Sequence, residues 1–97
     1  MPKGYWIGRV DVHDLETYKK YIAANAAPFA QFGARFLVRG GQFECREGSS
    51  RSRNVVIEFP SYADAIACYD SAAYQEAKAL RLPVSQGDII IVEGHED

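Results

Sequence analysis

A chain of 97 residues is the size of one domain, so we expect residues 1–97 to fold as a single unit with no separate catalytic module. The composition (47% hydrophobic, 25% charged) excludes extensive disorder, and the net charge of −2 argues against nucleic-acid binding, which needs a basic stripe. No apolar run reaches the roughly 18 residues of a membrane span, and the N-terminus lacks the apolar segment of a signal peptide. We therefore expect a cytoplasmic protein with neither a nucleic-acid nor a membrane partner.

The first predicted element is a strand over residues 5–12, where Val and Ile alternate with charged residues at a period of two. Asp14 is placed to cap a helix. The apolar stripe of that helix recurs every three or four residues, at Leu15, Tyr18, Ile22, Ala26 and Phe29. Pro28 predicts a kink or break between about residues 24 and 28, because it lacks a backbone N–H. Gly33 predicts a left-handed C-terminal cap.

The middle of the chain predicts strands and a turn. Residues 35–39 and 42–46 both look like strands and flank Gly40-Gly41, so the sequence predicts a tight hairpin there. Residues 54–59 form the clearest strand, which Pro60 ends.

The C-terminal third predicts two short helices and a final strand. Ser61 and Ser71 are placed as N-caps, the second of a helix over about residues 72–81. Residues 88–93 predict a strand that is apolar on both faces and therefore well covered.

The order of these elements is β-α-β-β-α-β, with an extra hairpin inside the second strand pair. This order indicates a ferredoxin-like α+β fold, an antiparallel sheet with the helices on one face. The helix-free face then carries apolar residues of the last two strands, and a second copy of the chain packed sheet to sheet would cover it. We therefore expect a homodimer.

Two other features have ordinary explanations. Cys45 and Cys68 stand apart without metal-ligand spacing, so we expect two buried, reduced thiols and no metal site. Arg46, Arg51 and Arg53 surround Gly48-Ser49-Ser50, which favours a solvated loop over a phosphate-binding patch.

Several segments resemble the family known as domain of unknown function 1330, in the dimeric α/β-barrel superfamily. They are residues 4–7 (Gly-Tyr-Trp-Ile), 35–41 (Arg-Phe-Leu-Val-Arg-Gly-Gly), 56–61 (Val-Ile-Glu-Phe-Pro-Ser), 71–74 (Ser-Ala-Ala-Tyr) and 92–94 (Val-Glu-Gly). The resemblance spans nearly the whole chain and implies a dimer whose two sheets form a barrel. Wider relatives include cofactor-independent monooxygenases, lactone isomerases and haem-handling enzymes, but the family offers no catalytic residues to carry over.

Charged residues inside strands are the first candidates for a site, because unpaired charge in a covered sheet is costly. Arg9, Arg39 and Glu58 are such residues on three predicted strands. Arg39 could bind a carboxylate with its planar fork, and Glu58 could be its partner or a general base. The alternative is a structural ion pair. Arg81 is a second anion-binding candidate, or an arginine that satisfies helix-end carbonyls.

The remaining candidates are aromatic, amide and imidazole side chains. Tyr5, like the other tyrosines, could orient a carbonyl or enolate or could simply belong to the core. Asn25 and Trp6 resemble in type and rough placement the residues with which monooxygenase relatives hold substrate. His13 could move a proton or bind haem, although a solvent-facing turn residue is the simpler interpretation. No cofactor-binding motif is present in the sequence, so we expect no cofactor.

Two functional hypotheses remain open. One is a small oxygenase or isomerase that acts without a cofactor on a carbonyl or phenolic metabolite, with Arg39 holding an anionic group and Glu58 or His13 moving a proton. The other is a non-catalytic dimeric module that binds a small ligand or only assembles. A cavity near these residues favours the first, and a filled core with Arg39 paired to Glu58 favours the second.

Overall fold

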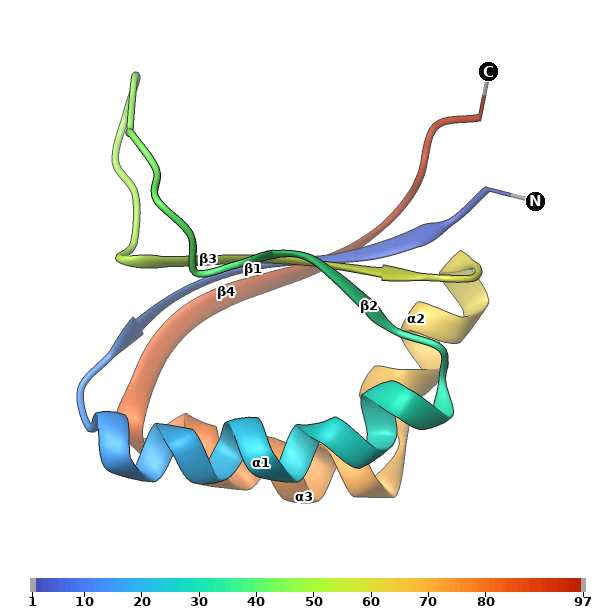
Figure 1. Ribbon diagram of the computed structural model, residues 1–97, viewed down its shortest axis with the longest axis horizontal. Helices are drawn as coiled ribbons and strands as arrows, with labels where there is room; N and C mark the ends of the chain where they lie inside the picture. Colours follow the sequence, from blue (N-terminus) through green and yellow to red (C-terminus); the bar gives the residue numbers. More distant parts are fainter. Residues whose placement is uncertain (1, 97) are drawn as a thin grey trace.

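Four antiparallel strands form one sheet in the order β2-β3-β1-β4, and all the helices lie on one of its faces (Figure 1). The structure is a computed structural model that describes residues 2–96. Its elements are β1 (Gly4–Val12), α1 (Leu15–Gln31), β2 (Arg35–Arg39), β3 (Arg53–Phe59), α2 (Tyr62–Asp70), α3 (Ala72–Arg81), a 3₁₀ turn η1 (Leu82–Val84) and β4 (Ser85–Glu93). The predicted ferredoxin-like order is confirmed, with α2 and α3 together forming its second helical segment.

Each of the three helices begins at a predicted cap. The side chains of Asp14, Ser61 and Ser71 accept hydrogen bonds from the backbone N–H of the residue three positions on, over 3.1–3.2 Å. Such bonds satisfy amides that have no partner inside the helix.

The predicted break in α1 is wrong, because the helix runs without interruption through Pro28 to Gln31. Pro28 stands in the last turn, so its missing donor costs one hydrogen bond near the helix end. Both Pro28 and Phe29 are buried, and this packing holds the turn in place. Gly33 follows with a φ of 73° and confirms the predicted left-handed cap.

The predicted hairpin at Gly40-Gly41 is also wrong. Residues 42–46 form no strand; β2 pairs directly with β3, and residues 40–52 form a long exposed loop between them. We call this loop the arm; it projects from the helix-free side of the sheet (Figure 1). The φ of 70° at Gly40 turns the chain into the arm, while its N–H still bonds to the Asn54 carbonyl over 2.9 Å. Among residues 2–96, no strand lies beside residues 42–46 to pair with them, so their alternation alone does not make a strand.

Register decides which residues face the helices. On β1, Trp6, Gly8 and Val10 face the helices, and their buried partners include Ile57 on β3. The helix-free face therefore receives Ile90 and Val92 of β4, whose exposed fractions are 57% and 39%. The expectation that β4 is covered on both faces is wrong for the single chain.

The core is built around Trp6, which is 2% exposed. Its ring centroid lies 4.9 Å from that of Tyr74, 5.2 Å from Phe29 and 5.4 Å from Phe59. Its indole Nε1 donates a 2.9 Å hydrogen bond to the carbonyl of Ala65 on α2. One side chain thus ties the sheet to α1, α2 and α3.

Only one of the two thiols is buried. Cys68 is enclosed between α2 and α1, whereas Cys45 lies exposed on the arm, so the prediction of two buried cysteines is half wrong. The error follows from the hairpin, since residues 42–46 would have been covered as a strand. Within residues 2–96, no helix is long and apolar enough to span a membrane.

Candidate active site

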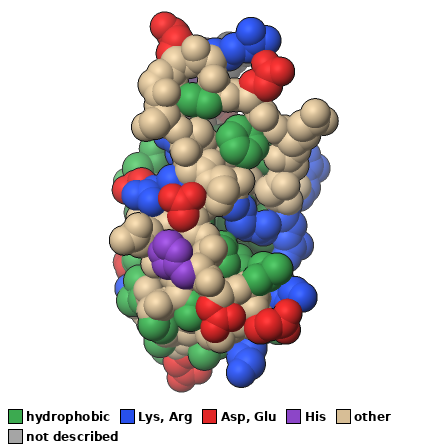
Figure 2. Space-filling model, turned by 90° about the vertical axis from the view of Figure 1, so that its left-hand side faces the viewer, with side chains coloured by type: hydrophobic (Ala, Val, Ile, Leu, Met, Phe, Trp, Pro, Cys, Tyr) green, Lys and Arg blue, Asp and Glu red, His purple; other side chains and the backbone are tan. Residues whose placement is uncertain are grey.

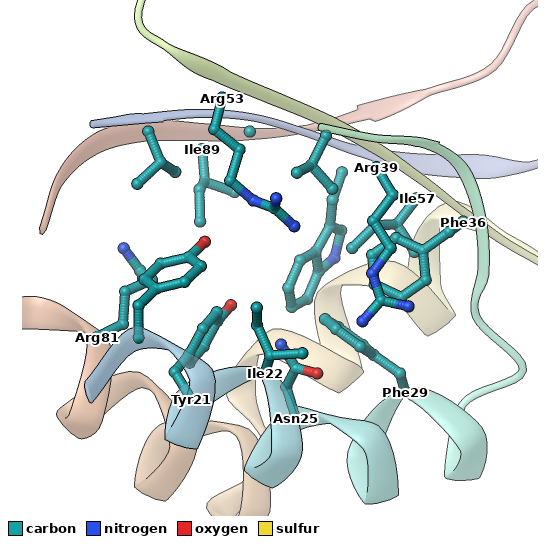
Figure 3. A pocket seen from close by; sticks show the side chains of 15 residues that line it. Tyr21, Ile22, Asn25, Phe29, Phe36, Arg39, Arg53, Ile57, Arg81 and Ile89 are labelled. Carbon is teal, nitrogen blue, oxygen red and sulfur yellow. The ribbon is translucent and has the colours of Figure 1, made fainter. Parts of the chain in front are cut away.

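A cavity lies between the helix-facing side of the sheet and α1 (Figure 3). The positions that the centre of a water molecule can take inside the cavity fill about 40 Å³. All the space between atoms, including the solvent-open mouth of the cavity, amounts to about 490 Å³. Most of the wall is aromatic or aliphatic, from Trp6, Val10, Ile22, Phe29, Phe36 and Ile57. The enclosed part is much smaller than the few hundred Å³ of a drug-sized site, so any larger ligand must extend through the mouth.

Gly8 creates part of this space. It sits in the middle of β1 between Trp6 and Val10, opposite Val55 and Ile89, where a side chain would point at α1. A Cβ at this position would meet only the Ile89 Cγ1 atom, at an ordinary contact distance of 3.6 Å. A glycine inside a strand usually costs stability. Here its absent side chain leaves room in the cavity.

Three arginines bring positive charge to the cavity. Arg39 comes from the end of β2, Arg53 from the start of β3 and Arg81 from the end of α3. Each guanidinium carbon lies over an aromatic ring: 4.1 Å from the centroid of Phe36, 5.7 Å from Tyr18 and 5.5 Å from Tyr21, respectively. Rings stabilise a cation but do not neutralise it.

No acidic side chain lines the cavity in the part of the chain that the structure describes. Nor does any of the three guanidinium groups form an ion pair with residues 2–96. The Nε atoms of Arg53 and Arg81 are buried and have no hydrogen-bond partner within the described residues 2–96. Buried donors are normally paired, so these two Nε–H groups are donors that a ligand in the cavity could use.

Hydroxyl and amide groups complete the polar lining. The hydroxyls of Tyr21 and Tyr74 share a buried hydrogen bond of 2.8 Å, and Arg81 lies against the same pair. Asn25 is 5% exposed and points from α1 toward the cavity (Figure 3). The Tyr21 hydroxyl and the Asn25 amide, which line the cavity, can orient a carbonyl or phenolic oxygen.

The structure divides the predicted site residues between two faces. Arg39, Arg81 and Asn25 share the cavity. Arg9, Tyr5 and Glu58 lie on the helix-free face, because the register places them in the opposite phase to Trp6 and Ile57.

The predicted partnership of Arg39 with Glu58 is wrong for the same reason. Glu58 instead accepts a 3.3 Å hydrogen bond from the Tyr5 hydroxyl and lies 3.9 Å from Arg35. His13 is exposed where β1 ends, and it does not line the cavity. Neither candidate proton carrier therefore reaches the cavity of its own chain.

Arg53 was missed as a site residue. The sequence places it beside Gly48-Ser49-Ser50 and predicts a solvated loop, but it is the first residue of β3 and points into the cavity (Figure 3). The signal that could have identified Arg53 is the alternation of the strand. Arg53 lies two, four and six residues before Val55, Ile57 and Phe59, so its side chain points to the same face, toward the helices. Tyr21 and Tyr74 both belong to the core, and Tyr21 also lines the cavity.

The other two arginines of that loop do serve a structural role. Arg51 bridges β1 and β4 by donating to Asp11 over 3.0 Å and to Asp88 over 2.9 Å. Arg46 pairs with Glu44 on the arm. Figure 2 shows basic and acidic side chains next to one another below the arm. A polar hollow lined by Arg9, Asp11 and Asp88 lies there, but its charges are already paired or hydrogen-bonded.

Burial of ionisable groups in the core predicts a loss of stability at high pH. Burial raises the pKa of the Cys68 thiol to about 12 and raises the pKa of the Tyr74 hydroxyl above its ordinary 10.0. The unfolded chain loses these protons first, so its lower proton count makes the free energy of unfolding fall as the pH rises above about 9. Urea unfolding at about pH 8 and about pH 10.5 should show this fall, and Tyr74→Phe should reduce it. An equal free energy of unfolding at the two pH values would contradict the conclusion that burial raises the pKa of Cys68 and Tyr74.

Comparison with solved structures places this architecture among small ferredoxin-like proteins, some of them oxygenases. A protein of unknown function from Rhodopseudomonas palustris matches with a TM-score of 0.77 and 15% identity over 99% of this chain and 85% of the other. SnoaB, a cofactor-independent oxygenase from Streptomyces nogalater, matches at 0.65 and 12% identity over 100% and 97%. A dimeric protein of unknown function and ferredoxin-like fold from Bacteroides fragilis matches at 0.62 and 12% over 94% and 95%. Identities this low establish the fold alone.

The chain belongs to the family described as domain of unknown function (DUF1330), whose model matches residues 3–95. The resemblance noted from the sequence is therefore confirmed. No curated protein matches the sequence significantly.

Proposed function

We propose that this protein is a cofactor-independent oxygenase or isomerase that binds a small carbonyl or phenolic metabolite in the cavity between the sheet and α1. The observation that carries the proposal is the convergence of Arg39, Arg53 and Arg81 on a cavity that no acidic side chain of residues 2–96 lines. Nearby positive charge favours the ionised form of a phenol or enol. That electron-rich form is the one that reacts with oxygen or moves a double bond.

The surroundings of the guanidinium groups support the same chemistry. The apolar wall keeps water away and strengthens each charge interaction. The Tyr21 hydroxyl and the Asn25 amide can hydrogen-bond a substrate oxygen. The fold likeness to SnoaB adds an analogy at the level of the fold.

The second candidate is a non-catalytic ligand-binding module. It is favoured by one observation: Glu58 and His13, the candidate proton carriers, lie outside the cavity. An enzyme built this way must take substrates acidic enough to ionise when the guanidinium groups stabilise the anion. We therefore expect turnover only for such substrates.

A neutral phenol and a neutral ketone separate the two candidates. We expect bound 4-hydroxybenzamide to ionise at a lower pH than the free phenol, as measured by phenolate absorbance, and 3-oxobutanamide to exchange its acidic C–H protons with deuterium faster in the presence of protein. Arg39→Gln should diminish both effects. Binding without exchange or oxygen uptake would favour the module. Absence of binding by these two amides and by the corresponding acids, 4-hydroxybenzoate and 3-oxobutanoate, would refute the site.

We also propose that a second copy of the chain covers the helix-free face. Support comes from the exposed apolar side chains gathered there, including Ile7, Val38, Ile90 and Val92, and from the arm that projects on the same side (Figure 1). An apolar face of this kind marks an interface. The Bacteroides fragilis structure of like fold is described as dimeric.

A charge on that face should separate the two copies. Ile90 lies on the edge strand β4 beside Ile7 of β1 and is 57% exposed, so Ile90→Asp would bury a carboxylate in the interface. Light scattering after gel filtration should report a dimer for the native protein and a monomer for the variant. Leu15→Asp is the matched control, because Leu15 is 58% exposed on the helical side and should leave the dimer intact. A native monomer at micromolar concentration would contradict the proposal.

A further inference from the structure

Two of the three arginines at the cavity each have one buried donor, the Nε–H, that no atom of residues 2–96 accepts from. Arg81 is 6% exposed and the Nε of its guanidinium has no hydrogen-bond partner. The Nε of Arg53 is likewise buried without a partner. Their neighbours Tyr74, Tyr21 and Tyr18 offer hydroxyls and rings, which are neutral groups. A buried guanidinium is normally matched by an anion that accepts from its planar fork.

Three acidic residues of the sheet are already engaged elsewhere. Asp11 and Asp88 accept hydrogen bonds from Arg51 below the arm. Glu58 faces away from the helices beside Tyr5 and Arg35. None of these three carboxylates pairs with Arg53 or Arg81, so a ligand can supply the anion for them.

The size of the enclosed space limits that anion. A volume of about 40 Å³ open to the centre of a water molecule holds roughly three water-sized groups, which is the size of a carboxylate. The exposed Arg39, stacked on Phe36, lies at a different edge of the cavity from Arg81 (Figure 3). It remains free for a second oxygen of the same ligand.

We propose that the ligand is a small hydroxyaromatic or oxo carboxylic acid, whose carboxylate is bound by Arg53 and Arg81 while its phenolic or enolic oxygen faces Arg39. This inference rests on the proposed function and names its substrate class. The aromatic wall of Trp6, Phe29 and Phe36 then contacts the carbon skeleton. The carboxylate and the ionised phenol or enol of this ligand supply the negative charge that no side chain of residues 2–96 supplies in the cavity lining.

Two pairs of isosteric compounds test the inference by calorimetry: 4-hydroxybenzoate against 4-hydroxybenzamide, and 3-oxobutanoate against 3-oxobutanamide. We expect each acid to bind at least tenfold more tightly than its amide. Arg81→Gln should remove that preference, and Arg53→Gln provides the same test if the first variant does not fold. Leu15→Asp should leave it unchanged. Arg53→Lys should restore only part of it, because an ammonium lacks the planar fork.

The outcomes separate the two proposals. Equal binding of acid and amide would overturn the carboxylate assignment and leave the proposed pocket standing. A preference that survives both Arg81→Gln and Arg53→Gln would also overturn it. Failure of all four compounds to bind at millimolar concentration would overturn this inference and the proposed function together.

Discussion

Gly8→Val is expected to abolish ligand binding while leaving the folded protein at least as stable as the native one. The new side chain would enter the space over Ile89 in which a Cβ makes only an ordinary 3.6 Å contact. Replacing a strand glycine gains roughly 0.5–1 kcal/mol for Ala, and a β-branched residue suits a strand better still. The added methyl groups would occupy the volume that a ligand needs. Urea unfolding and calorimetry with 4-hydroxybenzoate measure the two effects separately.

Gly8→Ala is the graded control for this experiment. It adds one methyl group, so we expect an intermediate loss of affinity and a gain in stability without overpacking. A Gly8→Val protein that folds normally and binds with native affinity would show that the cavity is not the binding site. A free energy of unfolding that rises while ligand affinity falls is the trade-off expected when a cavity is retained for ligand binding.

Trp6→Ala is expected to cost about 3–5 kcal/mol of the free energy of unfolding, the cost of truncating a large buried aromatic residue. Trp6 makes ring contacts with Phe29, Phe59 and Tyr74 and donates its indole N–H to Ala65. The loss therefore loosens the sheet from all three helices at once. A loss of this size is a large fraction of the 5–15 kcal/mol that stabilises a typical domain.

Trp6→Phe serves as the control, since it keeps an aromatic ring but removes the hydrogen bond to Ala65. It should cost less than Trp6→Ala in thermal or urea unfolding. If the two variants were equally stable, the aromatic contacts would not be holding the sheet to the helices.

The fold was predictable because local and global signals agree along most of the chain. Capping residues at Asp14, Ser61 and Ser71, the glycine at the end of α1 and the alternation along β1 each predict the observed element. The errors in the predicted elements, the break in α1 and the hairpin, arose where a local signal lacked its usual context. Pro28 stands in the last turn of a buried helix, and residues 42–46 alternate without a neighbouring strand.

The candidate site was predictable only in part, because a site depends on register. Arg39 and Arg81 are predicted as anion-binding residues because they are arginines. Whether Glu58 lies on the same face of the sheet as Arg39 depends on how β2 pairs with β3, which the sequence alone does not give. Arg53 was obscured by the serine- and glycine-rich loop before it. The cavity itself depends on the missing side chain of Gly8, which the sequence presents as a strand glycine like any other.

The central claim, that the cavity between the sheet and α1 is the ligand site, is tested most directly by an NMR titration with 4-hydroxybenzoate. Trp6 is the only tryptophan in the sequence, so its indole N–H gives a unique signal from the cavity wall, and the side-chain amide of Asn25 gives a second. We expect both signals to shift and saturate together, while the methyl groups of Ile90 on the helix-free face remain unmoved. Shifts at Ile90 with Trp6 and Asn25 unchanged would contradict the account.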